Sequence, residues 1–153
     1  VAANVQINEI SAYRSYDIGG YRLLTMPAVH SNTEEALLFY IEKGGRGYLH
    51  LHDTALPDGG IYDFLHANGA RAQAVALDCT YADRTVMPRP RHMNIEDCEE
   101  VIKNLKAAGV CDDKTRFIIT HFSHNCNPVR TRLAAIEKRY GVTAARDGME
   151  IEI

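Results

Sequence analysis

The feature that most constrains the fold is a set of short apolar runs, each of which ends in a histidine or an aspartate. His30, Asp53, Asp78 and His121 each follow such a run or close it. We interpret the runs as buried strands, and polar residues at the ends of buried strands extend into the loops at one edge of a sheet. The pattern therefore predicts that these four side chains gather at one sheet edge.

The first third of the chain is predicted to consist of strands. Glycine pairs between extended segments, such as Gly19-Gly20 and Gly44-Gly45, are typical of hairpins. The expected strands are, in chain order, one with Val5, Ile7 and Ile10, then residues 16–18, 21–26, 36–41 and 48–51. Residues 36–41 are expected to be a buried strand.

Strands and helices are expected to alternate in the remainder. The helices are residues 61–67, a helix from 95 to 108 with Asn94 as N-cap and Asp97 in the capping box, and a helix capped by Asn127 with Pro128 in its first turn. The strands are residues 72–77 and 117–119 and a closing hairpin of 142–145 with 149–153. This order predicts an α/β or α+β fold, with residues 1–153 as one unit.

Charge and cysteine content disfavour several classes of protein. Seventeen basic and 20 acidic residues leave a net charge of -3, whereas binding of nucleic acid usually requires a basic surplus. No long apolar run or signal-like start is present, so no membrane span is expected. The four cysteines form no C-x-x-C pair, which indicates reduced thiols in a cytoplasmic protein.

Two imidazoles and a carboxylate are a suitable donor set for Zn²⁺ or a similar ion. His30, Asp53 and His121 are therefore candidate metal ligands, although a single strand-end histidine is more often a surface residue. His50 and His52 share one strand face, where two solvent-facing histidines need no ligand. The residues alone leave a metal site and ordinary surface histidines as open alternatives.

His92 and the loop before it are candidates for contacts with an anionic substrate. His92 lies just before a helix N-terminus, where the imidazole holds its proton less tightly, and it could act as a general acid or bind phosphate. Arg84, Arg89 and Arg91 could also bind phosphate. The alternative for all four residues is simple exposure to solvent.

Six segments occur in the order of the motifs of one known family. They are Leu24-Thr25-Met26-Pro27-Ala28-Val29-His30, Tyr48-Leu49-His50-Leu51-His52-Asp53-Thr54, Leu77-Asp78-Cys79-Thr80-Tyr81, His92-Met93-Asn94-Ile95, Thr120-His121-Phe122-Ser123-His124 and Asp147-Gly148-Met149-Glu150. In this order they resemble the metallo-β-lactamase-fold hydrolases. The segments that begin with His92 and Asp147 are similar to the phosphodiesterase branch, and the nearest subgroup is the cyclic phosphodiesterases associated with carbon–phosphorus lyase.

The resemblance implies hydrolysis of a small phosphodiester by metal-activated water at a dinuclear site holding two Zn²⁺ or Mn²⁺ ions. By this resemblance His30, Asp53 and His121 are metal ligands, and Asp53 bridges the two ions. His92 is then the catalytic or phosphate-contacting histidine. His124, together with Arg91 from the preceding loop, is expected to contact the substrate.

The resemblance implies the C-terminal half of an αββα sandwich, with one mixed sheet and its helices on one face. Nothing before His30 resembles the H-x-H-x-D-H signature of the family's N-terminal half, and the chain begins with Val1. We therefore expect a fragment that is inactive alone and binds one ion weakly or none. Its bare sheet face would favour self-association, for example as a homodimer.

Two alternatives to the phosphodiesterase are a non-catalytic binding or assembly module that keeps the fold, and an RNA 3′-end-processing endonuclease of the same superfamily. Thr120-His121-Phe122-Ser123 resembles the endonuclease branch as well, and the negative net charge counts against it.

Overall fold

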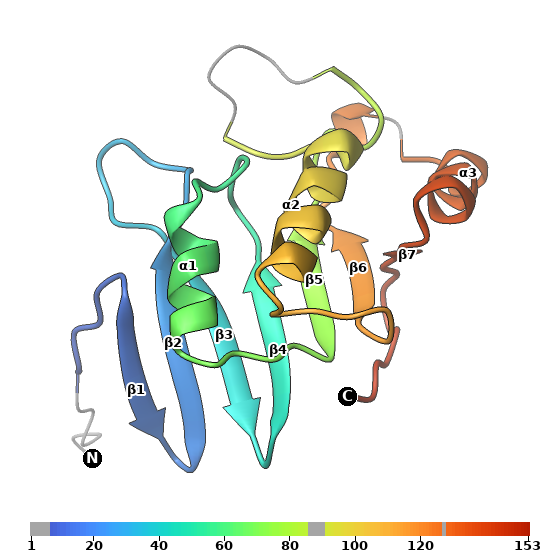
Figure 1. Cartoon of the computed structure of the whole chain (residues 1–153). Helices are drawn as coiled ribbons and strands as arrows, with labels where there is room; N and C mark the ends of the chain where they lie inside the picture. The colour runs from blue at the N-terminus through green and yellow to red at the C-terminus, as the bar shows by residue number, and fades with distance from the viewer. Residues whose placement is uncertain (1–6, 86–90, 127) are drawn as a thin grey trace, which may run out of the picture.

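The computed structural model describes residues 7–85, 91–126 and 128–153. In these residues the strands are β1 (Arg14–Ile18), β2 (Tyr21–Pro27), β3 (Leu37–Lys43), β4 (Arg46–Leu51), β5 (Ala74–Asp78), β6 (Arg116–Thr120) and β7 (Thr143–Ala144) (Figure 1). The helices are α1 (Gly60–Ala67), α2 (Ile95–Ala107) and α3 (Arg130–Tyr140), and a short 3-10 turn, η1, is formed by His124–Cys126.

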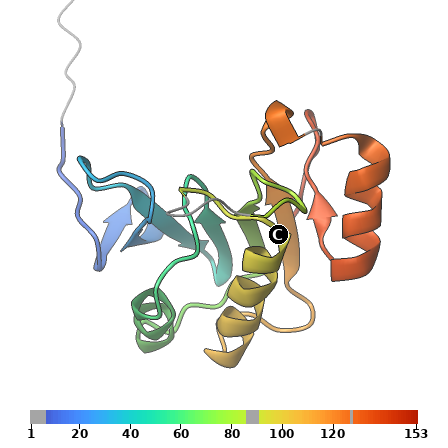
Figure 2. The same cartoon turned by 90° about the horizontal axis from the view of Figure 1, so that it is seen from above.

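The described strands form one mixed sheet, in the order β1-β2-β3-β4-β5-β6-β7. The pairs from β1 to β4 are antiparallel, and those from β4 to β7 are parallel. Parallel neighbours need a crossover connection, and α1 and α2 provide it from β4 to β5 and from β5 to β6. Both helices cover the same face of the sheet (Figure 2). The predicted class, one mixed sheet with helices packed on one face, is confirmed.

The core lies between the sheet and these two helices. In β3, Leu38 and Tyr40 are fully buried beneath the helices, whereas Phe39 and Ile41 are half-buried. The expected buried strand at residues 36–41 is therefore a strand that is fully buried on one face only, because alternate side chains of a strand point to opposite faces and the helices cover only one. β5 lies near the middle of the sheet and is buried at every position.

The face opposite the helices is lined by half-buried apolar side chains, which are Leu23, Phe39, Ile41 and Tyr48. Over the neighbouring strands this face is partly covered by the end of the chain. Met149, Ile151 and Ile153 line a groove of about 430 Å³ there with Ala74, Ala76 and Ile118.

The predicted C-terminal hairpin is wrong. β7 pairs in parallel with β6, and residues 149–153 form no strand. The carbonyl oxygens of Glu152 and Ile153 accept hydrogen bonds from Arg116 Nη1 at 3.0 Å and Arg46 Nη1 at 2.7 Å. Side-chain donors thus take the place of a strand partner, and the alternating apolar residues of this segment pack on the open sheet face.

The predicted N-terminal strand is wrong where the structure describes it, since residues 7–12 form no strand; Val5 lies outside the described residues. Ile7 is 86% exposed, so its apolar side chain has no core to enter. Side chains instead form hydrogen bonds with the backbone of this segment. Thr25 Oγ1 donates to Ser11 O at 2.7 Å, and Glu35 Oε1 accepts from Ala12 N at 2.9 Å.

The observed N-terminus agrees with the predicted one for α2 and differs from it for α3. Asn94 and Asp97 form the predicted capping box at the start of α2. In contrast, α3 begins at Arg130 with Val129 as its extended N-cap, so Pro128 precedes the helix. The predicted cap, Asn127, lies outside the described residues. No helix in the described part of the chain has the length and apolar content needed to cross a lipid bilayer.

Candidate metal centre

Four strands that run in the same direction bring the predicted strand-end residues to one edge of the sheet. β2, β4, β5 and β6 point the same way, because β2 and β4 are both antiparallel to β3. His30 follows β2, Asp53 follows β4, Asp78 closes β5, and His121 follows β6. The upper edge of the sheet in Figure 1 is where all four strands end.

Two imidazole nitrogens approach one carboxylate oxygen at this edge. His121 Nε2 lies 3.2 Å from Asp53 Oδ1, and His30 Nε2 lies 3.9 Å from the same oxygen. Two ligands about 2.05 Å from a tetrahedral zinc ion are separated by about 3.3 Å. The spacing of His121 and Asp53 therefore fits a divalent ion such as Zn²⁺, whereas His30 Nε2, at 3.9 Å, lies outside the cluster of possible ligand atoms formed by Asp53, Asp78, His92 and His121.

The backbone turns sharply at two of these residues. Asp53 has φ 50° and His121 has φ 63°, which is the left-handed region that non-glycine residues seldom adopt. Such a conformation costs about 1–3 kcal/mol and is concentrated at functional sites. The turns direct Asp53 and His121 towards each other just beyond their strands.

His92 is held by a buried carboxylate next to this centre. Its Nδ1 atom lies 2.7 Å from Oδ2 of Asp78, whose side chain is 0% exposed. His121 Nδ1 lies 3.6 Å from the same oxygen. The possible ligand atoms of Asp53, Asp78, His92 and His121 all lie within 4.8 Å of one another.

Asp78 has no vacant acceptor position for a metal ion. Its Oδ1 accepts from Thr80 N at 3.0 Å and Thr80 Oγ1 at 2.7 Å. Its Oδ2 accepts from Thr54 N at 3.2 Å and pairs with His92 Nδ1 at 2.7 Å. A carboxylate offers about four lone-pair positions, and these four donors fill them. Although Asp78 is close enough to be a ligand, we therefore assign it to orienting its neighbours.

These contacts fix the proton positions on two histidines. His92 Nδ1 faces a carboxylate, and His30 Nδ1 lies 3.1 Å from the carbonyl oxygen of Arg91. Both partners only accept hydrogen bonds, so each Nδ1 is the donor and each Nε2 keeps its lone pair when the ring is neutral. An Nε2 lone pair is what a metal ion or a proton requires.

The loop that carries His92 is tied to the end of β5 by backbone hydrogen bonds. Tyr81 N donates to Met93 O at 3.1 Å, and Ile95 N donates to Ala82 O at 2.7 Å. His92 therefore has a fixed position between the sheet edge and the start of α2, and its ring stacks on that of His121 with 5.2 Å between centroids.

The two expected substrate contacts are both exposed, Arg91 in the loop before His92 and His124 in η1. Arg91 is exposed and lines, with His30, a pocket of about 650 Å³ that also contains Ser31, Asn32 and Asp58. His124 is exposed in η1 and is absent from the group of ligand atoms found among the described residues.

His50 and His52 also remain outside that group. Their rings lie 3.9 Å apart, and His50 Nδ1 is 3.0 Å from the hydroxyl of Tyr48. Burial lowers the pKa of His52 to about 4, and the neighbouring His50 and His121 add to the shift. The ring is therefore neutral at pH 7.

Asp78 and Thr80 are the site residues whose roles the sequence did not reveal. The sequence identifies Asp78 only as a strand end and Thr80 only as part of a motif. The available signal is the spacing of Asp78 and Thr80 at the end of a buried strand, because a hydroxyl two residues after a carboxylate can donate a hydrogen bond to it and contact the next strand end.

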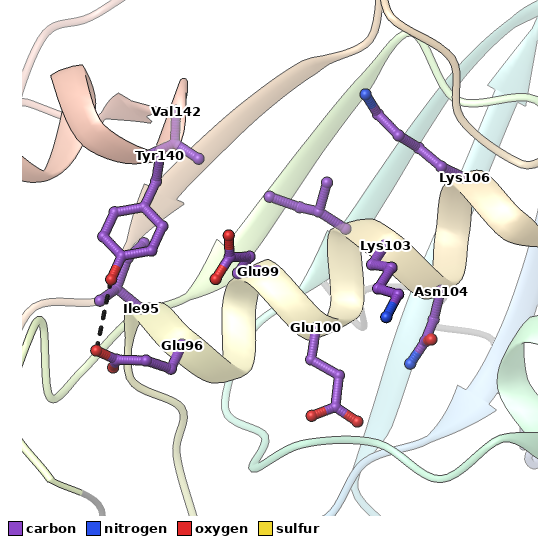
Figure 3. A pocket seen from close by; sticks show the side chains of 10 residues that line it. Ile95, Glu96, Glu99, Glu100, Lys103, Asn104, Lys106, Tyr140 and Val142 are labelled. Carbon is purple, nitrogen blue, oxygen red and sulfur yellow. Dashed lines mark hydrogen bonds between the residues drawn. The ribbon is translucent and has the colours of Figure 1, made fainter.

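A separate groove of about 810 Å³ lies between α2 and the C-terminal end of α3 with the residue Val142 that follows it, and no histidine lines it (Figure 3). Glu96, Glu99 and Glu100 line it together with Tyr140, whose hydroxyl is 3.5 Å from Glu96. It contains none of the candidate site residues.

No protein-family model matches the sequence, and no curated protein matches it. Several solved structures do share its architecture. The metallo-β-lactamase fold protein YhfI from Bacillus subtilis has a TM-score of 0.65 at 14% identity, over 92% of this chain and 52% of YhfI. Zinc-bound PqqB from Methylobacterium extorquens has a TM-score of 0.65 at 19% identity, over 99% of this chain and 57% of PqqB. The fold is the metallo-β-lactamase fold.

A third structure agrees with this result. A possible metal-dependent hydrolase from Veillonella parvula has a TM-score of 0.60 at 14% identity, over 88% of this chain and 55% of its own length. The chain thus spans about half the length of the metallo-β-lactamase-fold structures that it matches.

Proposed function

We propose that this chain provides part of the metal centre of a metal-dependent hydrolase that cleaves small phosphodiesters. The observation that carries the proposal is the approach of two imidazole Nε2 atoms, from His30 and His121, to one oxygen of Asp53. The matched structures include zinc-bound PqqB and a possible metal-dependent hydrolase, which supports metal chemistry in this fold.

His30, Asp53 and His121 are the proposed ligands of Zn²⁺ or Mn²⁺. A bound ion would polarise a phosphoryl oxygen and make water acidic enough to act as a nucleophile near neutral pH. A carboxylate can bridge two ions through its two oxygens, and Asp53, whose side chain is 55% exposed, is accessible for this role.

His92 is the proposed general acid. When both of its ring nitrogens carry protons, Nδ1–H remains bonded to Asp78, and Nε2–H can be donated to the leaving oxygen of the substrate. The buried carboxylate stabilises the resulting orientation throughout the transfer. Arg91, beside His30, is proposed to bind a non-bridging phosphate oxygen, and His124 to contact the substrate from η1.

The chain alone is proposed to bind one ion weakly and to be inactive. Three ligands at one centre suit one ion, and a dinuclear site needs more. The four cysteines are free and buried, which supports a cytoplasmic location. The net charge of -3 disfavours an RNA substrate.

A non-catalytic binding module is the second candidate. It is favoured by the open sheet face, where Leu23, Phe39, Ile41 and Tyr48 are only half-buried. Such a module would bind a partner through this fold and would not catalyse a reaction.

Zinc titration by calorimetry tests the metal centre. We expect one site in the chain, with affinity at least tenfold lower in Asp53→Asn and His121→Gln. Asp63→Asn, which changes an exposed aspartate in α1, is the matched control and should bind as the unaltered chain does. Equal affinity in all four proteins would overturn the metal centre.

Turnover is then tested with the product of the complete coding sequence. After loading with zinc or manganese, it should hydrolyse bis(p-nitrophenyl) phosphate and nucleoside cyclic phosphates, and His92→Ala should slow the reaction by about 10²–10⁴-fold. Binding of zinc without hydrolysis of any phosphodiester would favour the binding module.

A further inference from the structure

Thr80 lies between the buried carboxylate and the histidine that follows β6. Its Oγ1 atom is 2.7 Å from Asp78 Oδ1 and 2.8 Å from His121 Nδ1. The same oxygen is 3.0 Å from the carbonyl oxygen of His121, and Thr80 is 8% exposed. The hydroxyl therefore has three close polar neighbours and little access to solvent.

Hydrogen-bond roles decide which nitrogen of His121 carries the proton. A threonine hydroxyl has one hydrogen to donate and can accept through its lone pairs. Asp78 Oδ1 and the carbonyl oxygen of His121 can only accept, and the shorter contact, 2.7 Å against 3.0 Å, favours Asp78 Oδ1 as the acceptor of this hydrogen. His121 Nδ1, 2.8 Å away, then forms a hydrogen bond with Oγ1 only if it carries a proton and donates it.

We infer that Thr80 is a positioning residue that holds His121 in its Nδ1–H tautomer and so turns the Nε2 lone pair towards the metal centre. His121 Nε2 is the atom that lies 3.2 Å from Asp53 Oδ1. In the opposite tautomer His121 Nδ1 carries no hydrogen. Thr80 Oγ1 can then donate to either His121 Nδ1 or Asp78 Oδ1, and the other atom would face the Oγ1 lone pair without a proton between them. In a buried position this arrangement is costly.

Backbone hydrogen bonds keep the hydroxyl in this position. Cys79 N donates to Thr120 O at 2.9 Å, and Ser123 N donates to Thr80 O at 3.2 Å. Thr80 N itself donates to Asp78 Oδ1 at 3.0 Å. The segments after β5 and β6 are thereby tied together on both sides of the Thr80 and His121 pair.

The consequence is a continuous chain of hydrogen bonds from His121 through Thr80 and Asp78 to His92. One buried carboxylate thus sets the proton positions of the proposed ligand and the proposed acid together. The importance of this chain for metal binding rests on the proposed function, whereas the tautomer of His121 does not.

Two substitutions separate this role from simple packing. Thr80→Val keeps the shape of the side chain and removes the hydroxyl, and Thr80→Ser keeps the hydroxyl and removes the methyl group. Histidine-labelled protein is studied by long-range proton–nitrogen NMR at a pH well above 6.5, where an unperturbed imidazole is neutral. His121→Gln identifies the signals of His121.

We expect an Nδ1–H pattern for His121 in the unaltered chain and in Thr80→Ser, and an Nε2–H or mixed pattern in Thr80→Val. Zinc affinity by calorimetry should fall about 10–100-fold in Thr80→Val and be restored in Thr80→Ser. Thermal unfolding shows whether each variant is folded.

The inference is overturned by an Nε2–H pattern in the unaltered chain, a result that does not depend on the folding of any variant. It is also overturned if both substitutions act alike on the tautomer, because the hydroxyl would then not matter. An Nδ1–H pattern that depends on Thr80, in a chain that binds no zinc, supports the inference and rejects the proposed metal centre.

Discussion

Asp78 is fully buried, and its two oxygens accept hydrogen bonds from three separate segments of the chain, through Thr54, Thr80 and His92. A buried charge is tolerated only when donors of this kind surround it. At the scale of single residues, the structure of the site therefore depends on this carboxylate as much as on the proposed ligands.

Replacing Asp78 by asparagine should destabilise the protein strongly. The new amide group would direct N–H donors at groups that are themselves donors, so we expect the free energy of unfolding to fall by about 2–3 kcal/mol. Urea unfolding of the metal-free chain measures the change. The matched control is Asp53→Asn, which is exposed and whose left-handed backbone suits asparagine. It should change the stability by less than about 0.5 kcal/mol, and equal losses would contradict our assignment.

His52 should make the metal-free chain less stable in acid. Its pKa is lowered from 6.5 to about 4, chiefly by burial and further by His50 and His121. The unfolded chain binds a proton on this ring at a higher pH than the folded chain does. The contribution of the neutral His52 ring to the free energy of unfolding is therefore fully present above pH 6.5 and is lost as the pH falls towards 4. Because the ring is partly exposed, we expect a loss of about 1–2 kcal/mol.

The contribution of His52 is isolated by comparing urea unfolding of the unaltered chain and His52→Phe from pH 7 down to about 4. The difference between the two should change with pH, whereas His66→Gln, an exposed histidine in α1, should leave the pH dependence intact. Parallel curves for the unaltered chain and His52→Phe would refute the prediction.

At the scale of elements, the start of α2 connects stability to the site. Asn94 closes the capping box with Asp97, and its Nδ2 donates to Arg84 O at 3.1 Å. Asn94→Ala should cost about 1 kcal/mol and lower the melting temperature by about 2–4 °C. Thermal unfolding measures this, with the exposed Asn125→Ala as control. An unchanged melting temperature in Asn94→Ala would show that the cap is not needed.

The sequence predicted those elements whose signals are local. The capping box of α2 and the glycine turn between β1 and β2 depend on residues close to one another in the chain. In contrast, residues 7–12 and 149–153 have apolar side chains suited to strands but form none. Their conformation is decided by distant partners, such as Arg46 and Arg116 for the C-terminal segment, which no local pattern contains.

At the scale of the whole molecule, the open sheet face predicts self-association. Burial of the half-exposed apolar side chains of this face against a second copy would contribute about 25 cal/mol per Å² and offset part of the cost of association. We expect sedimentation velocity to show concentration-dependent oligomers, and the double variant Phe39→Glu, Ile41→Glu to be monomeric. Lys103→Glu, on the exposed side of α2, should behave as the unaltered chain does. A monomer at all concentrations would contradict the prediction.

The position of the site was predictable because it follows from topology. Polar residues at the ends of strands that run in one direction must meet at one edge, as His30, Asp53 and His121 do. The hydrogen-bond chain through Thr80 and Asp78 was not predictable, because it depends on distances of a few tenths of an ångström between segments far apart in sequence. The roles of His124 and Arg91 stay predictions.

The left-handed backbone at Asp53 and His121 has an implication for how this sequence can drift. Glycine or asparagine would relieve the torsional penalty at either position. Selection for thermal stability alone would therefore replace both residues. The backbone conformation at Asp53 and His121 lowers the stability of the protein. Homologues that no longer use these two side chains are therefore expected to lose them early. Positions 53 and 121 are therefore expected to change early if the proposed site were no longer under selection.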